Sequence, residues 1–197
     1  MQLKKLLKQL WYFIWEDDSI WSWIVNIILA FVLIKFIVYP GLGFILGTGY
    51  PIVAVVSSSM EHDSNFDNWW EQNQDWYFGK GILKDNFKAF SFVNGFNRGD
   101  IIMLHGKEPK DIKIGDVIVF RNSRPDPIIH RVVKIWQENN AYYFHTKGDN
   151  NKDSIKSIDL DETRINQEDV IGVALFKIPL LGYIKIWFVE LVQLIVR

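Results

Sequence analysis

Three consecutive serines, Ser57 to Ser59, are the first residues whose type and spacing suggest chemistry. They follow an apolar run and precede Met-Glu-His-Asp, so they suit neither the interior of a strand nor the start of a helix. A serine hydroxyl acts as a nucleophile when a base takes its proton and a third group orients that base. Such chemistry requires a base and an acid from elsewhere in the chain.

His130 is the histidine best placed to be that base. It lies in the middle of "PIIHRVV", whose β-branched residues predict a strand, and a strand holds a side chain rigidly. His62 lies in a polar loop near the serines and His105 at a strand end, where each fits a solvent-exposed turn. A lone histidine in a strand is more often structural than catalytic, so His130 needs further support.

A carboxylate follows on the next predicted strand. The segment "TKGDNN", Thr146 to Asn151, contains Asp149. Hairpin geometry brings this segment back beside the strand of His130, where a carboxylate could reach the imidazole. The alternative is that Gly148 and Asp149 form an ordinary turn.

Short runs rich in β-branched residues occupy the chain from Gly99 onward and predict a mainly β domain, over residues 40–178. These runs are "DIIML", "DVIVF", "PIIHRVVKIW", "AYYFHT" and "VIGVALFKI". The turn at Glu138 to Asn140 predicts a hairpin between two of them. A β domain of short strands would therefore position His130 and Asp149.

An apolar segment at residues 19–39 predicts a transmembrane helix. It carries one charge, and about 20 helical residues match a hydrocarbon core about 30 Å thick. No A-x-A cleavage pattern follows, which argues against a signal peptide. Pro40 and the glycines after it predict that the helix ends near Tyr39. Lysines precede this span and none follows it for about 40 residues, so the positive-inside rule places the N-terminus in the cytoplasm.

Two further segments are predicted to meet the membrane. In residues 1–18, lysines lie opposite one helical stripe of apolar side chains: Leu3, Leu6, Leu7, Leu10 and Ile14. This pattern suits a cytoplasmic helix on the membrane surface, or a simple extension of the span. Residues 179–197 predict an apolar, membrane-associated helix, which either crosses the membrane or lies flat on it.

Residues 64–97 form an insertion dense in aromatic side chains. One interpretation is that these rings enter the membrane interface, where aromatic residues are favoured. The other is that they pack as a lid or small subdomain on the β domain. The sequence alone leaves both open. The aromatic residues concerned are Trp69, Trp70, Trp76, Tyr77 and Phe78.

The composition excludes several classes of function. The net charge is −1, so the chain lacks the basic patch typical of nucleic-acid binding. It has no cysteine, which excludes a disulfide framework, a thiolate zinc site and a cysteine nucleophile. We expect no metal and no cofactor.

Four motifs in order, behind one N-terminal span, resemble the type I signal peptidases (family S26), in the archaeal and endoplasmic-reticulum branch. They are "SSSM", "GDVIVF", "IIHRVV" and "TKGDNN". The resemblance covers residues 20–60 and 98–182, and each motif is weak alone. Bacterial members use a lysine base, whereas this chain has His130 at the matching place, which indicates the branch.

The resemblance implies a role for each candidate residue. Ser59 is the expected nucleophile, His130 the general base and Asp149 the orienting acid. The hydroxyl of Ser57 is expected to help the backbone N–H of Ser59 bind the oxyanion. Met60 is expected to line the pocket for the small residue before the cut.

The chain departs from the family pattern at two positions. His62 replaces a common proline, and Ile155 stands where relatives carry a second aspartate. Asp153 is the nearest substitute and is a second candidate acid.

The resemblance predicts a membrane-anchored serine endopeptidase that removes signal peptides from translocated preproteins, with the catalytic domain outside the cytoplasm. Expected partners are signal peptides, membrane lipid and a secretion channel. The substrate would bind as an extended strand. Two alternatives remain: a protease of the same fold with a dedicated client, and a non-catalytic membrane module that binds a partner through its aromatic insertion.

Overall fold

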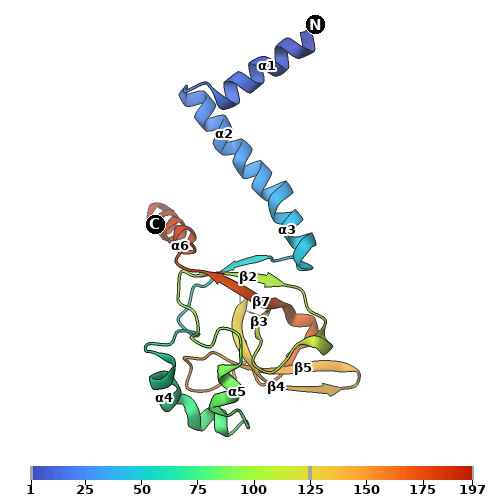
Figure 1. The fold of residues 1–197 in the computed structure, drawn as a ribbon, viewed down its shortest axis with the longest axis vertical. Helices are drawn as coiled ribbons and strands as arrows, with labels where there is room; N and C mark the ends of the chain where they lie inside the picture. Colours follow the sequence, from blue (N-terminus) through green and yellow to red (C-terminus); the bar gives the residue numbers. More distant parts are fainter. Residues whose placement is uncertain (1, 124–125, 197) are drawn as a thin grey trace. The chain divides into compact units, whose positions relative to one another are not determined.

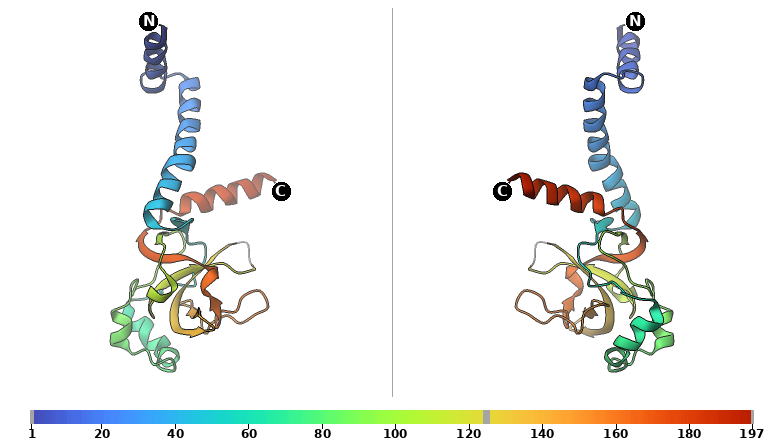
Figure 2. Two further views of the ribbon diagram at one scale, coloured as in Figure 1. Left: turned by 90° about the vertical axis from the view of Figure 1, so that its right-hand side faces the viewer. Right: turned by 90° about the vertical axis from the view of Figure 1, so that its left-hand side faces the viewer.

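The computed structural model describes residues 2–123 and 126–196. It divides into two units, an N-terminal helical unit up to Ile45 and a β domain from Leu46 onward. Figures 1 and 2 show the helices of the first unit and the strands of the second.

The N-terminal unit contains one helix long and apolar enough to span a membrane. The helical segments are α1 (Gln2–Trp15), α2 (Ile20–Leu33), the π-helical turn η1 (Ile34–Val38) and α3 (Tyr39–Leu46). The last three form a continuous helix of 27 residues, in which an 18-residue stretch has a mean hydropathy of 2.2. At 1.5 Å per residue it is about 40 Å long and exceeds the hydrocarbon core. Within the described residues it is the only helix that meets these criteria.

The prediction that this helix ends near Tyr39 was wrong. The chain remains helical through Pro40 as far as Leu46. A proline inside a helix has no N–H to donate, and its ring crowds the carbonyl four residues earlier. Here the wider π-helical turn of η1 ends at Val38, two residues before Pro40, and the Tyr39 N–H donates to the carbonyl of Ile34. The π turn provides a geometry in which the proline is accommodated.

Two polar side chains of α2 fix the corner between α1 and α2. The Ser22 hydroxyl donates to the Phe13 carbonyl at 2.5 Å, and the Asn26 amide donates to the Ile14 carbonyl at 2.9 Å. These carbonyls lie in the last turn of α1, where a helix leaves such groups without intrahelical partners. The two polar residues in the apolar helix therefore cap the preceding helix.

The β domain is a seven-stranded antiparallel sheet, which confirms the predicted mainly β fold. The strands lie in the order β1-β2-β7-β3-β4-β5-β6. Their bounds are β1 Ile52–Ala54, β2 Ile101–His105, β3 Val117–Phe120, β4 Ile128–Glu138, β5 Ala141–Lys147, β6 Ile165–Asn166 and β7 Val170–Ile178. Short 3₁₀ turns occupy Pro109–Asp111 and Gln167–Asp169. All five runs predicted from Gly99 onward are strands.

The predicted hairpin joins β4 to β5. Asn139 and Asn140 both have positive φ, at 49° and 63°, as a two-residue type I′ turn requires. Asparagine tolerates this conformation better than most side chains. The pairing brings Arg131 opposite Lys147, so the end of β5 lies beside His130 as expected.

Two hydrophobic clusters pack against the sheet. One surrounds Val55, Met60 and Phe96 together with Ile102, Leu104, Val117, Val119 and Ala174. The other joins β3, β4, β5 and β7 to the loop before β6: Ile112, Ile118, Phe120, Val132, Phe144, Leu160, Ile165 and Val173. Consecutive residues of β3 belong to different clusters, because successive side chains of a strand point to opposite faces. The segment that carries the serines is therefore anchored in the core through Val55 and Met60.

The aromatic insertion folds as two helices, α4 (Phe66–Phe78) and α5 (Lys84–Lys88), which lie together at one side of the β domain (Figure 1). Asn65 caps α4 by accepting the Asn68 N–H. Trp69, Trp70 and Tyr77 form a buried cluster with Ile82, Phe87 and Val133 of β4. Of the two interpretations, packing on the β domain describes these three rings. Phe78 remains 45% exposed.

The last helix, α6, spans Tyr183–Val196. Its 14 residues give about 21 Å, which is shorter than a hydrocarbon core of about 30 Å. The ring of Tyr183 packs against Gly99, where an added Cβ would lie 2.1 Å from the ring. This contact fixes the start of α6 on the β domain.

A fully buried arginine connects the insertion to the sheet. The Arg131 guanidinium donates to three backbone carbonyls, those of Ser91, Phe92 and Gly115, at 2.7, 2.9 and 3.0 Å. It also forms an ion pair with Asp149 at 2.7 Å, and both side chains are fully buried. Removing one partner of a buried pair leaves an uncompensated charge.

We therefore predict that Arg131→Met destabilises the protein by about 3–5 kcal/mol. For a protein of this size the midpoint of thermal unfolding should fall by roughly 10 °C. The matched control is Arg164→Met, which breaks a half-exposed pair with Glu138 and should cost less than about 1 kcal/mol. Equal effects of the two substitutions would contradict a structural role for Arg131.

Candidate active site

A serine and a histidine from distant parts of the chain lie side by side in the β domain. Ser59 lies in the loop that follows β1, and His130 lies in β4 opposite Ile118 of β3. The Ser59 Oγ atom is 2.9 Å from Nε2 of His130, within hydrogen-bond distance. His130 is 3% exposed, so the surrounding strands hold its ring in place. Both residues predicted from the sequence as nucleophile and base are brought together.

The carboxylate that meets the other nitrogen of His130 belongs to Glu162. Its Oε1 atom contacts Nδ1 of His130 and also accepts the Thr146 hydroxyl at 3.0 Å. Its Oε2 atom accepts the backbone N–H of Ile155 at 2.6 Å. Glu162 is fully buried, and each carboxylate oxygen has a partner. A base oriented in this way by a buried carboxylate is the arrangement of a Ser-His-acid triad.

Asp149 lies elsewhere than the sequence predicted. Its carboxylate accepts bonds from Arg131, from His62 at 3.2 Å and from the Tyr77 hydroxyl at 3.2 Å, instead of contacting His130. Burial alone raises the pKa of Asp149. Attraction to Arg131 and the bonds from His62 and Arg131 outweigh burial and hold the pKa well below its ordinary value. Asp149 is therefore an ionised structural carboxylate at the base of the site.

The second candidate acid, Asp153, also bonds elsewhere. It is exposed and accepts the Trp76 indole N–H at 2.8 Å and the Ser154 backbone N–H at 2.7 Å. The hydrogen bonds to Trp76 and Ser154 lower the pKa of Asp153. Its carboxylate is thus held at the surface beside α4.

The sequence reasoning missed Glu162, although one signal pointed to it. Ile155 occupies the place of the second aspartate expected from the resemblance, so another acid had to be sought. The Ile155 backbone and Glu162 bond each other twice, since the Glu162 N–H also donates to the Ile155 carbonyl at 2.9 Å. Glu162 reaches the same spot from the neighbouring segment. No local pattern separates it from Asp159 and Asp161, which lie in the same loop.

The Ser57 hydroxyl lies close enough to the nucleophile to help stabilise an oxyanion. The hydroxyl of Ser57 lies 3.2 Å from that of Ser59. The carbonyl of Ser59 accepts the Asn150 backbone N–H at 2.8 Å, and the Ser58 carbonyl accepts the Asn150 amide at 3.2 Å. These bonds turn the carbonyls of the serine loop toward the "TKGDNN" segment.

A cavity of about 300 Å³ opens beside Ser59 and His130. One wall is the chain from Ala54 to Ser57, and the other runs from Asp126 to Ile129. Met60, predicted to line the substrate pocket, is instead fully buried in the core, where its sulfur accepts the Asp149 N–H at 3.3 Å. The cavity walls are therefore made mainly by small and aliphatic side chains.

No group of three or more His, Asp or Glu side chains within residues 2–123 and 126–196 is arranged to hold a metal ion.

Comparison with known proteins gives consistent names. No family model matches the chain. The signal peptidase complex catalytic subunit sec11 of Schizosaccharomyces pombe is 32% identical over 120 residues, which cover 51% of this chain and 64% of that protein. SEC11 of Komagataella phaffii is 30% identical over 163 residues, covering 79% of this chain and 76% of the relative. SEC11 of Scheffersomyces stipitis is 29% identical over 158 residues, covering 79% and 75%.

The match to the Komagataella protein covers most of both chains at 30% identity. The relative's name agrees with the family that the sequence motifs resemble. The chain belongs to the family of SEC11-type signal peptidase catalytic subunits.

Proposed function

We propose that this protein is a membrane-anchored serine endopeptidase that cleaves signal peptides from translocated preproteins. One observation carries the proposal: Ser59 Oγ lies 2.9 Å from Nε2 of His130, whose Nδ1 atom meets the buried Glu162. The names of the relatives support the same activity. The reaction is acyl transfer followed by hydrolysis.

In the proposed mechanism His130 accepts the proton of the Ser59 hydroxyl as the Oγ atom attacks the scissile carbonyl. The negative charge that develops on the carbonyl oxygen is stabilised by the Ser59 N–H and the Ser57 hydroxyl. His130 then gives its proton to the leaving amine. Water then attacks the acyl-enzyme while His130 accepts its proton. His130 returns that proton to Ser59 Oγ as the ester bond breaks. Glu162 orients the imidazole and offsets its positive charge throughout.

The cavity walls suit an extended peptide. Strand β1 is at the edge of the sheet, and the chain after it forms one wall of the cavity beside Ser59. An extended substrate can add to such an edge through main-chain hydrogen bonds, while shallow pockets select alternate side chains. The limited volume of about 300 Å³ favours small residues near the cut.

The two alternatives are less well supported. A protease of the same fold with a dedicated client would use the same residues, so only its substrates would differ. A non-catalytic module has no need of a buried carboxylate that orients a histidine beside a serine. Trp69, Trp70 and Tyr77 of the insertion are also buried in one cluster with Val133 of β4, which leaves these three rings unavailable to a partner.

We further propose that the N-terminal unit anchors the enzyme with its N-terminus in the cytoplasm and the β domain outside. The lysines of α1 precede the span, as the positive-inside rule requires. The relatives are named as subunits of a complex, so we expect partner subunits for this chain. A secretion channel is a further expected partner, because the proposed substrates are translocated preproteins. Confinement of enzyme and substrate to one bilayer raises their effective concentration.

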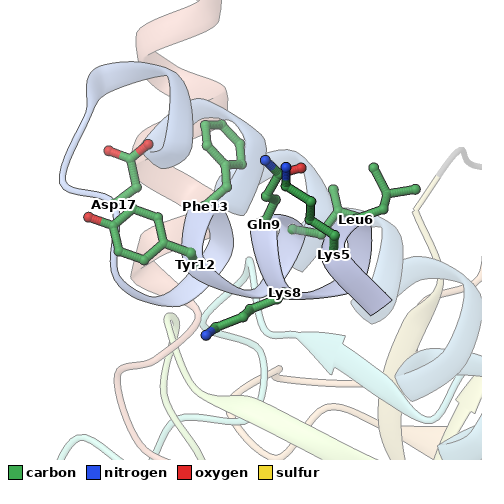
Figure 3. A pocket seen from close by; sticks show the side chains of 8 residues that line it. Lys5, Leu6, Lys8, Gln9, Tyr12, Phe13 and Asp17 are labelled. Carbon is green, nitrogen blue, oxygen red and sulfur yellow. The ribbon is translucent and has the colours of Figure 1, made fainter. Parts of the chain in front are cut away.

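Helix α1 supports a contact with the cytoplasmic membrane surface. Its leucine stripe is exposed, with Leu3 at 69% and Leu7 at 57%. Figure 3 shows the side chains that line a shallow hollow of about 680 Å³ along α1 and the turn after it: Lys5, Leu6, Lys8, Gln9, Leu10, Tyr12, Phe13 and Asp17. The hollow is lined by charged groups of Lys5, Lys8 and Asp17 and by the apolar side chains of Leu6, Leu10 and Phe13. Because charged and apolar side chains meet here, we assign the hollow to the boundary between the polar and apolar faces of a surface-bound helix.

The serine row gives the first test. Ser59→Ala should abolish cleavage of a test preprotein in liposomes, and Ser58→Ala should retain most activity, because the base meets only the Ser59 hydroxyl. Ser57→Ala should lower kcat by roughly 10²–10³-fold if its hydroxyl stabilises the oxyanion. A serine-reactive fluorophosphonate should label Ser59. Equal losses from Ser58→Ala and Ser59→Ala would show that the nucleophile is misassigned.

The acid gives the second test. Glu162→Gln should lower kcat by roughly 10²–10⁴-fold, by analogy with removal of the group that orients a triad histidine. Asp153→Asn, an exposed control, should stay near wild type. Thermal unfolding of each variant separates a loss of rate from a loss of fold. If Glu162→Gln cleaves normally, Glu162 is not the orienting acid.

The absence of cysteine permits a test of topology and of α1 with single substitutions. In sealed cells a membrane-impermeant maleimide should label Asp159→Cys in the β domain, and label Lys5→Cys only after permeabilisation. In liposomes, an environment-sensitive fluorophore should report an apolar surrounding at Leu7→Cys and water at Lys5→Cys. Labelling of Lys5→Cys from outside would reverse the orientation, and equal emission at both sites would exclude the surface helix.

A further inference from the structure

The turn after β5 contacts the serine loop and the catalytic histidine at once. A Cβ added at Gly148 would lie 2.8 Å from His130 Nε2 and 2.8 Å from the Ser59 carbonyl oxygen, so the backbone approaches both closely. The next residue but one, Asn150, donates its backbone N–H to the Ser59 carbonyl. A shift of this turn would therefore change the distance between Ser59 and His130.

The same turn is held from the other side by α4 of the insertion. The Tyr77 hydroxyl donates to Asp149 at 3.2 Å. His62, which bonds the other oxygen of Asp149, stacks on the Trp69 ring with 3.8 Å between ring centroids. Tyr77 and Trp69 are 0% and 3% exposed. The insertion thus contacts the turn through the buried side chains of Tyr77 and Trp69.

Lys147 is a buried cation inside this contact. Its ammonium donates to the carbonyls of Gly148 and Asp149 at 3.1 and 3.2 Å. It lies 5.1 Å from the ring centroids of both Trp76 and Tyr77, within cation–π range. Lys147 is fully buried. The ammonium therefore ties the backbone of the turn to the aromatic face of α4.

Burying an ammonium costs several kcal/mol of desolvation free energy, which an aliphatic side chain at the same position would avoid. Burial lowers the pKa of Lys147 to about 8, against the opposing attraction of Asp149, Glu162 and Asp153, and repulsion from Arg131 also lowers it. Tyr77, whose pKa burial and Asp149 raise well above its ordinary value, faces it as a neutral phenol. At neutral pH the cation and its contacts with both backbone carbonyls are present.

We propose that Lys147 and Tyr77 are positioning residues, through which the aromatic insertion holds the 147–151 turn and so sets Ser59 against His130. The inference rests on the proposed function, because it concerns the same nucleophile and base. It assigns the insertion a role in catalysis at a distance from the substrate. Neither residue touches the reacting atoms.

The test uses the full chain in liposomes with a test preprotein. Lys147→Met keeps length and removes charge, and Tyr77→Phe removes one hydroxyl. Both should lower kcat by roughly 10-fold or more with KM nearly unchanged, since a misplaced catalytic group slows the chemical step. The controls are Lys134→Met, an exposed cation over the Trp136 ring on the same hairpin, and Tyr142→Phe. Both controls should cleave like wild type.

The pH profile separates positioning from folding. Wild-type kcat should fall as pH rises through about 8, where Lys147 loses its proton, and Lys147→Met should lack this fall. Between about pH 8 and 10.5 the unfolded lysine still holds a proton that the folded one has released, so fold stability should rise with pH. A falling kcat therefore cannot be attributed to unfolding through Lys147.

Four outcomes would overturn the inference. Wild-type kcat in both Lys147→Met and Tyr77→Phe would show that the turn needs neither residue. A loss that matches the fraction of unfolded protein, or an unchanged alkaline fall in Lys147→Met, would leave Lys147 a purely structural residue. Cleavage by Ser59→Ala in the same assay would instead overturn the proposed function and, with it, this inference.

Discussion

Burial of a charge-balanced group beside His130 is the constraint on which the site depends. Arg131 and Lys147 supply two cations, Asp149 and Glu162 supply two carboxylates, and all four side chains are fully buried. Unpaired charges at such depth would each cost several kcal/mol, so each must be held against partners in fixed geometry. That requirement couples β4, β5, the Glu162 loop and the insertion, because no one of these segments satisfies the group alone.

Glycine at position 148 shows how closely these segments approach. Any side chain there would overlap His130, the Ser59 carbonyl and the Asn151 amide. The "TKGDNN" segment therefore has a different role from the predicted one, which was to supply the acid at His130. Its aspartate is a structural anchor in the buried ion pair with Arg131, and its glycine and Asn150 lie against the nucleophile. The motif shapes the site without supplying the acid at His130.

The sequence predicted the strands, the hairpin and the apolar helix, because these depend on local periodicity and turn chemistry, and the Ser59–His130 pair was implied by the resemblance to the type I signal peptidases. It did not predict Glu162, since which carboxylate reaches Nδ1 of His130 depends on how the loop before β6 folds back onto Ile155. It also misplaced the end of the apolar helix, because the π-helical turn that accommodates Pro40 has no sequence pattern comparable to a helix cap. The fate of the insertion's aromatic rings required knowing that Val133 of β4 faces them.

The replacement at Ile155 has a physical consequence for the acid. An aspartate there would approach His130 from the strand-end loop itself, whereas Glu162 reaches it from the facing segment with one more methylene. The longer side chain has more rotamer freedom to lose. Three contacts restrict it here: the Thr146 hydroxyl, the Ile155 N–H and Nδ1 of His130. Thr146 of β5 and His130 of β4 belong to the strands that the buried charges and α4 hold in place. The orientation of the base and the position of the nucleophile therefore depend on the same packing.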